Sequence, residues 1–82
     1  MNAHFEAQLK ATKAAVQKKV QNVKPHPLGH AFLWGTVEAK YKNGKSKYFK
    51  VCLGSVCADD LDECVRLAET VPGVTNVYYN MD

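Results

Sequence analysis

The hydrophobic pattern of the chain centres on two runs of aromatic and β-branched residues, at 32–41 and 46–53. Such side chains suit the pleated, half-buried surface of a β-strand. The polar segment between the runs contains Asn43-Gly44, which favours a tight hairpin because a type I′ turn needs positive φ at both central residues. The pattern therefore predicts a β-hairpin over residues 32–54, and we expect the rest of the chain to pack around it.

Two registers of this hairpin are compatible with the sequence. A two-residue loop at Asn43-Gly44 would place Trp34 opposite Leu53. One face would then carry Phe32, Trp34, Phe49, Val51 and Leu53. A three-residue loop, made of a type I turn and a glycine bulge, would exchange the faces of the first strand. The apolar residues of the second strand would then lie beside Leu33, Val37 and Ala39. Because the first strand is apolar on both faces near its start, a helix on each face of the sheet is one expected arrangement.

Residues 1–24 form the predicted N-terminal segment, with an amphipathic helix from residue 3 to residue 24. Its stripe recurs at helical spacing within an arc of about 80°. The stripe consists of Phe5, Leu9, Thr12, Val16, Val20 and Val23. A helix of this length is marginal in water by itself, so it needs to dock on the sheet or on a partner. A second copy of the same helix is one candidate partner, which makes a homo-oligomer an alternative.

The remaining elements complete one domain. Residues 25–31 contain two prolines and a glycine, and they predict an extended connector to a core at 32–82. A second helix is expected over residues 60–70, capped by Asp59 or a neighbour. Its buried stripe would be Leu61, Cys64, Val65 and Ala68. A last strand follows at 74–79. The order α-β-β-α-β predicts an α+β fold with a three-stranded antiparallel sheet that has the hairpin at its centre.

The composition argues against several classes of protein. No apolar run approaches the ~18 residues that a membrane helix needs, and the lysine-bearing residues 1–24 do not have the pattern of a signal peptide. The three cysteines (Cys52, Cys57 and Cys64) are odd in number, which favours a cytoplasmic protein over a disulfide-stabilised one. Their spacing matches no zinc signature, even with His4, His26 or His30 added. We therefore expect a non-enzymatic protein with no metal and no cofactor.

The net charge of +3 conceals a strong asymmetry along the chain. Residues 1–50 hold ten lysines against Glu6 and Glu38, a net charge of +8, whereas residues 51–82 have a net charge of −5. The most distinctive cluster, here called the basic hairpin, is Lys40, Tyr41, Lys42, Lys45, Lys47, Tyr48 and Lys50. Lysines among aromatic rings bind an acidic protein surface or nucleic acid. The plainer interpretation is solubility and protection of an exposed strand edge. The absence of arginine from residues 1–50 argues against base-specific readout.

Residues 32–80 also resemble the small RNA-polymerase inhibitors that short-tailed coliphages encode. The matching segments are Trp34-Gly35-Thr36-Val37-Glu38, Phe49, Val51, Ala58-Asp59-Asp60-Leu61-Asp62-Glu63, Leu67-Ala68-Glu69 and Val71-Pro72-Gly73. The resemblance implies a compact phage-encoded domain that binds and blocks host machinery. That family engages the polymerase partly through arginines late in its last strand, whereas the last strand here offers Asn76, Tyr78 and Asn80. The polymerase as a target is therefore not implied by this strand.

The sequence thus predicts a small binding protein, phage or mobile-element encoded, that inhibits or modulates a larger host complex. The basic hairpin would occupy an acidic surface or groove of that complex. Aromatic anchors would be Trp34, Tyr41, Tyr48, Tyr78 and Tyr79, where exposed. The alternative is a nucleic-acid-binding module that uses the basic hairpin and the first helix.

Overall fold

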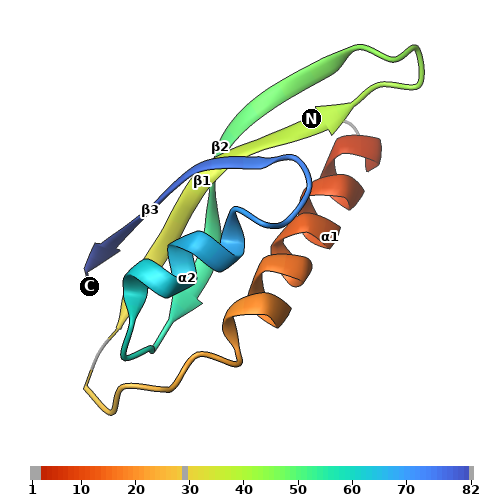
Figure 1. The fold of residues 1–82 in the computed structure, drawn as a ribbon. Coiled ribbons are helices and arrows are strands. Elements are labelled where there is room, and N and C mark those ends of the chain that lie inside the picture. Colours follow the sequence, from red (N-terminus) through yellow and green to blue (C-terminus); the bar gives the residue numbers. More distant parts are fainter. Residues whose placement is uncertain (1–2, 29, 82) are drawn as a thin grey trace.

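A computed structural model describes residues 3–28 and 30–81 of the chain. Within these residues the elements follow the predicted order α-β-β-α-β (Figure 1). They are α1 (Ala3–Val20), β1 (Ala31–Lys40), β2 (Ser46–Val56), α2 (Leu61–Ala68) and β3 (Val74–Met81). The strands form one antiparallel sheet in the order β2-β1-β3, so the hairpin supplies the central strand and one edge. The α+β class and the three-stranded antiparallel sheet are confirmed.

The two strands of the hairpin are joined by the three-residue loop, so the two-residue alternative is wrong. The backbone N–H of Gly44 donates to the carbonyl of Tyr41 at 3.2 Å, and the N–H of Tyr41 donates to the carbonyl of Lys45 at 2.7 Å. Gly44 has a φ of 87°, while Asn43 is not among the residues with positive φ. Instead, the Asn43 side chain accepts a hydrogen bond from the N–H of Lys45 at 3.0 Å. This is a type I turn with a glycine bulge, in which glycine alone supplies the left-handed conformation.

The loop length decides which face of β1 becomes the core. Val37 lies opposite Phe49, and the odd-numbered residues of β1 from Ala31 to Ala39 are all buried. The even-numbered residues Phe32, Trp34, Thr36 and Glu38 are only half-buried. Both helices pack on the odd-numbered face, since residues of α1, α2 and this face form one core (Figure 1). The expectation of one helix on each face is therefore wrong.

A bulge carries β2 past the predicted end of the hairpin. Cys52 pairs with Trp34 and Gly54 pairs with Leu33, so Leu53 is an extra residue in β2. Gly54 has a φ of 116°, and the carbonyl of Leu53 accepts a hydrogen bond from Gln17 Nε2 at 3.0 Å. Residues 55 and 56 therefore extend β2 beyond the predicted end of the hairpin at residue 54. Glycine at the bulge is what lets the strand continue.

A second bulge shifts the register of β3. Thr75 lies opposite Thr36, but Tyr78 lies opposite Trp34, so the segment at Asn76 carries one extra residue. Asn76 has a φ of 54°, a left-handed conformation that asparagine tolerates better than most residues. The strand continues to Met81, beyond the predicted end at residue 79. The consequence is that Tyr78 shares a face with Trp34.

The helices agree with their predicted stripes. Phe5, Leu9, Val16 and Val20 are buried, which confirms the stripe of α1. These side chains lie under the sheet of the same chain, and α1 ends at Val20 rather than at residue 24 because residues 21–23 form a turn. The predicted connector follows, of which Gly29 lies outside the described residues.

The second helix begins and ends close to the prediction. Asp60 is its N-cap, and one side-chain oxygen of Asp60 accepts a hydrogen bond from the N–H of Glu63 at 3.0 Å. Cys64 and Ala68 are buried, while Leu61 and Val65 are half-buried against the same core. The stripe of α2 is therefore confirmed, although the helix is shorter than residues 60–70.

Candidate functional site

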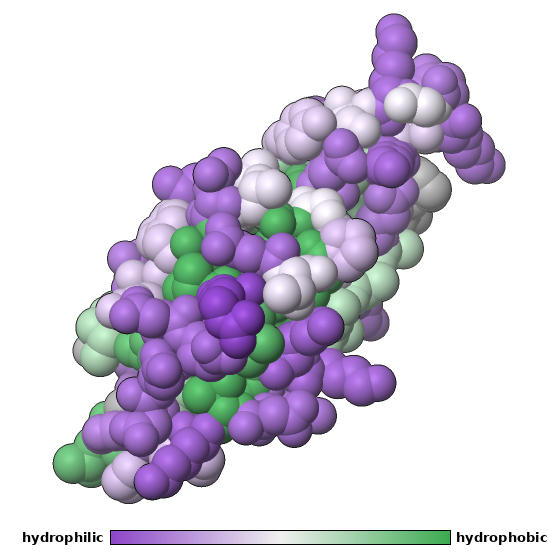
Figure 2. Space-filling model, viewed as in Figure 1, coloured by the Kyte–Doolittle hydropathy of each residue, from purple (hydrophilic) through white to green (hydrophobic). Residues whose placement is uncertain are grey.

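The basic hairpin forms one end of an elongated molecule of 45 × 20 × 18 Å (Figure 1). β3 accompanies β1 only as far as Val37, so the tip of the hairpin extends beyond the three-stranded part of the sheet. In the space-filling view this end carries mainly hydrophilic residues (Figure 2). The acidic helix α2 lies toward the opposite end (Figure 1). The lysines of the hairpin tip are therefore separated in space from the acidic residues of α2, whereas α1, which carries lysines of its own, packs beside α2.

The base of the hairpin is fixed to α1. The side-chain amide of Gln8 donates to the carbonyl of Lys40 at 2.8 Å and accepts from the N–H of Lys40 at 2.9 Å. These bonds occupy the edge of β1 just beyond the end of β3. The ring of Phe5 packs edge-on against Tyr41, with centroids 4.5 Å apart, and also lies 5.9 Å from Phe49. The hairpin is thus presented in a defined position rather than as a loose loop.

The sheet divides the basic hairpin between two faces. Tyr41 contacts Phe5 on the face that carries the helices, and Lys45 pairs with Tyr41. On that face the Lys47 ammonium lies 5.4 Å from the centroid of the Phe49 ring. On the other face the Lys50 ammonium lies 5.3 Å from the centroid of the Tyr78 ring. The predicted cluster is therefore two groups, because alternate residues of a strand point to opposite faces.

Glu38 contacts the residues of the basic hairpin that lie on the face of the sheet opposite the helices. The Tyr48 hydroxyl donates to Glu38 Oε2 at 3.0 Å, and this hydrogen bond, followed by the charge of Glu38, raises the pKa of Tyr48. The Lys40 ammonium lies 3.8 Å from Glu38 Oε1. Among the residues that the structure describes, Lys42, Lys45 and Lys47 have no carboxylate within ion-pair distance. These three lysines carry the available positive charge of the tip.

Three acidic residues of the α2 segment, Asp60, Glu63 and Glu69, have partners in α2 or in β3. Asp60 caps the N-terminus, where the helix dipole favours negative charge. Glu63 forms a bidentate ion pair with Arg66, and this pair raises the pKa of Arg66. Glu69 accepts a hydrogen bond from the N–H of Val77 at 3.4 Å. The acidic segment therefore does not neutralise the tip of the hairpin.

The three cysteines do not share a site. Cys64 is buried, Cys52 is half-buried, and Cys57 is exposed with its thiol donating to the carbonyl of His26 at 2.6 Å. His26 Nδ1 in turn accepts from the N–H of Leu28 at 3.1 Å. Within residues 3–28 and 30–81, with the His4 side chain outside the described part, no group of three or more His, Cys, Asp or Glu is placed to hold a metal ion.

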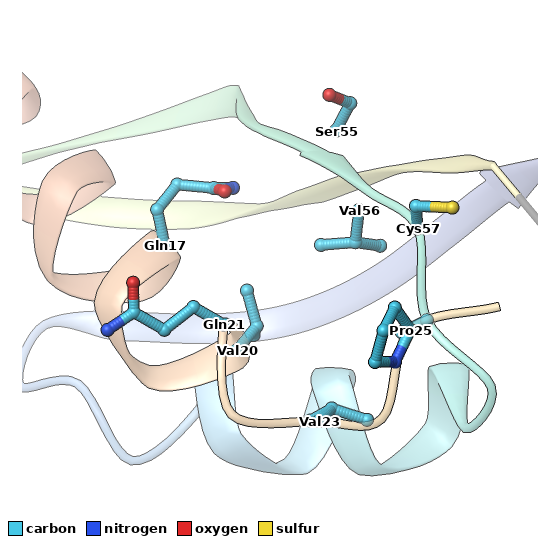
Figure 3. A pocket seen from close by; sticks show the side chains of 9 residues that line it. Gln17, Val20, Gln21, Val23, Pro25, Ser55, Val56 and Cys57 are labelled. Atoms are coloured by element: carbon cyan, nitrogen blue, oxygen red, sulfur yellow. The ribbon is translucent and has the colours of Figure 1, made fainter. Parts of the chain in front are cut away.

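A small hollow lies beside Cys57, between the end of α1 and the end of β2 (Figure 3). Its volume is about 180 Å³, below the roughly 300–1,000 Å³ of typical ligand pockets. It is lined by Gln17, Val20, Gln21, Val23, Pro25, Ser55, Val56, Cys57 and Ala58. This lining supplies amides, a hydroxyl and a thiol, but neither the carboxylate nor the imidazole that would activate a cysteine nucleophile.

The cysteines should differ sharply in their reaction with iodoacetamide. Burial, and to a smaller extent the charges of Asp60 and Glu63, raise the pKa of Cys64. A raised pKa lowers the thiolate fraction at any given pH, and the thiolate is the nucleophile. We expect Cys57 to be alkylated first at about pH 8, and Cys64 only when denaturant is added. Peptide mass spectrometry over time measures this order. Equal rates for Cys57 and Cys64 in the native protein would contradict the packing of α2.

Four of the predicted aromatic anchors are exposed: Tyr41 (39%), Tyr48 (64%), Tyr78 (38%) and Tyr79 (37%). Trp34 is half-buried. Sequence reasoning missed that Lys50, Trp34 and Tyr78 come together on one face. The three-residue loop, one of the two predicted alternatives, places Lys50 and Trp34 on the same face. The position of Tyr78 depends on the bulge at Asn76, and no sequence pattern predicted that bulge.

No helix within the described residues combines the length and the apolar character needed to cross a membrane. Comparisons of the chain with protein-family models, curated proteins and solved structures return no match.

Proposed function

We propose that this protein is a small non-enzymatic binding protein that inhibits or modulates a larger host complex. In this proposal the tip of the basic hairpin docks onto an acidic surface or groove of that complex in the cytoplasm. The observation that carries the proposal is the exposure of Lys42, Lys45 and Lys47 on a protruding tip, without carboxylate partners among the described residues. Complementary charge raises the rate of association and suppresses wrong partners.

The anchoring of the hairpin supports docking rather than solubility alone. Gln8 holds Lys40 by two hydrogen bonds, and Phe5 supports Tyr41 from below. A surface held in its binding conformation loses less entropy on association than a mobile loop does. Tyr41 and Tyr48 remain exposed beside the lysines and would supply the apolar contacts in which interface energy concentrates.

The origin of the protein is part of the same proposal. Residues 32–80 resemble the polymerase inhibitors of short-tailed coliphages, which supports a phage or mobile-element source and a host complex as the target. The last strand carries no arginine. We therefore leave the polymerase as one of several host complexes that the capture experiment would detect.

The test reverses the charge of the tip in the double variant Lys45→Glu and Lys47→Glu. The tagged full chain is incubated with a bacterial lysate, and captured proteins are quantified by mass spectrometry. We expect the double variant to lose roughly 90% or more of a specific partner, because steered association falls steeply when charges are reversed. The matched control is Lys18→Glu with Lys19→Glu, which makes the same charge change at exposed positions of α1. This control should retain the partner.

Two outcomes would reject the proposal. Unchanged capture by the tip variant at ~50 mM salt, where surface charges are weakly screened, would remove the hairpin from the mechanism. Loss of all capture after nuclease treatment would favour the alternative, a nucleic-acid module built from the basic hairpin and α1. In that alternative Lys45 and Lys47 lie on the helix-bearing side of the sheet, and α1 exposes Lys18 and Lys19 at its end away from the hairpin.

A further inference from the structure

The face of the sheet opposite the helices is an uncovered aromatic surface, here called the open face. Its rows run across the strands in the order β2-β1-β3. One row is Cys52, Trp34 and Tyr78, the next toward the hairpin tip is Lys50, Thr36 and Thr75, and the next toward the C-terminus is Ser55, Phe32 and Asn80. The bulges in β2 and β3 create these rows, because each bulge shifts one edge strand by a residue against β1.

Side chains from both edge strands meet above the central strand. Lys50 is on β2 and Tyr78 is on β3, on opposite sides of β1, and their backbones are therefore about 10 Å apart. The Lys50 ammonium nevertheless lies 5.3 Å from the centroid of the Tyr78 ring. Trp34 lies beside Tyr78 as its partner on the neighbouring strand β1. One ammonium group and two aromatic rings are thus gathered at the centre of the open face.

The chemistry of the open face favours stacking over aliphatic packing. Phe32, Trp34 and Tyr78 supply rings, and His30 extends the series with its ring 5.4 Å from Phe32 in an edge-on arrangement. Among the described residues of this face there is no Leu, Ile, Val or Met. The other side chains are the ring of Tyr48, hydroxyls, the amide of Asn80, the thiol of Cys52, Lys40, Lys50 and Glu38. Glu38 is held by Tyr48 and Lys40.

This combination matches the way proteins bind single-stranded nucleic acid. Bases that are not paired stack on aromatic side chains, and lysines contact the backbone phosphates. A duplex presents its bases only inside grooves, and its major groove admits a helix or a two-stranded ribbon rather than the flat face of a three-stranded sheet. Lysine without arginine suits contacts that tolerate any sequence.

We propose that the open face binds single-stranded nucleic acid, with bases stacked on Trp34 and Tyr78 and a phosphate held by Lys50. A base that enters the row displaces the Lys50 ammonium from the Tyr78 ring toward the backbone phosphate. This surface is separate from the tip lysines Lys45 and Lys47, which project on the helix-bearing side. The open face can therefore be occupied while the tip docks on another molecule.

The chain contains its own probe for this binding. Trp34 is its only tryptophan, so the emission of Trp34 reports directly on the open face. The test titrates the full chain with an oligothymidylate of about eight nucleotides, within the range of known single-strand sites. We expect quenching of Trp34 at ~50 mM salt, with affinity that falls as salt rises. A blunt duplex of equal length should quench far less.

Paired variants separate the two faces of the same strands. Tyr78→Ala and Lys50→Glu should each weaken binding about tenfold, the scale of losing one stacked base or one phosphate contact. Tyr79→Ala is the matched control for the ring, because Tyr79 pairs with buried Leu33 and lies on the helix-bearing face. Lys47→Glu is the matched control for the charge. Both controls should bind nearly as the unaltered protein does, and circular dichroism verifies that each variant is folded.

Three results would overturn the proposal. The first is an absence of quenching by the single strand at low salt. The second is an equal loss of nucleic-acid binding in Lys47→Glu and Lys50→Glu, which would indicate a general charge effect that does not depend on the face of the sheet. The third is equal quenching by the duplex. Loss of partner capture in the Lys45→Glu and Lys47→Glu variant, together with retained quenching, would support both proposals as separate surfaces.

Discussion

Replacing Leu33 by alanine is expected to remove about 2–5 kcal/mol from the free energy of unfolding, the range for truncating a buried leucine. Leu33 is fully buried (0% exposed) on the central strand. The side chain lies in the core that the sheet shares with both helices. A domain of this size has a total stability of roughly 4–12 kcal/mol, so the change would consume a large part of it. Urea unfolding followed by the fluorescence of Trp34 measures the difference.

Leu28→Ala is the matched control, because it removes the same atoms from a side chain that is 90% exposed. We expect this control to change the free energy of unfolding by no more than about 0.5 kcal/mol. The comparison also tests the hairpin register. A two-residue loop would put Leu33 on the face away from Phe49, Val51 and Leu53. Similar urea midpoints of unfolding for Leu33→Ala and Leu28→Ala would therefore contradict both the burial of Leu33 and the three-residue loop.

The elements of this fold could be predicted because their signals are local. The stripe from Phe5 to Val20 has the period of a helix, and the acidic start of α2 marks its N-terminus. Aromatic and β-branched runs mark the strands around the turn at Asn43-Gly44. Each of these features depends on residues within one or two turns of each other, so no knowledge of tertiary packing is needed to find them.

The faces of the sheet could not be predicted, because they depend on single residues that alter the register. Asn43-Gly44 permits loops of two or three residues. The φ of Asn43, which is not positive, and the hydrogen bond from the N–H of Tyr41 to the carbonyl of Lys45 distinguish them. Bulges then shift β2 at Leu53 and β3 at Asn76. Each shift of one residue moves every later side chain to the other face. The placement of both helices on one side follows from these choices.

The same reason limits what the sequence says about the candidate site. The basic hairpin was found from its composition, but its division between two faces was not, because composition ignores the alternation along a strand. Lys47 and Lys50 are close in sequence and have the same charge, yet one lies over Phe49 and the other over Tyr78. The contact of Lys50 with a ring on β3 joins residues from the two outer strands of the sheet, and no local pattern encodes it.

Replacing Gly54 by alanine tests which interactions stabilise the bulge in β2. Gly54 has a φ of 116°, a conformation that side chains with a Cβ rarely adopt, and a methyl group there would overlap the amide of Gln17. We expect Gly54→Ala to cost about 2–4 kcal/mol, from backbone strain and from the displaced amide. Gly44→Ala is the matched control, since its φ is 87° but no atom lies within 4 Å of the added methyl group. That control should cost only about 1–2 kcal/mol.

A double-mutant cycle separates the two causes at Gly54. Gln17→Ala alone should cost about 1–3 kcal/mol, because the carbonyl of Leu53 loses its donor. In that background Gly54→Ala no longer meets the amide, so only the backbone strain remains. The double variant should therefore be more stable than the sum of the single changes by about 1 kcal/mol or more, the size typical of residues in contact. Urea unfolding of all four proteins gives this difference. If the two changes in unfolding free energy were strictly additive, Gln17 would not lie over Gly54. The contact between Gln17 of α1 and the β2 bulge would then be contradicted.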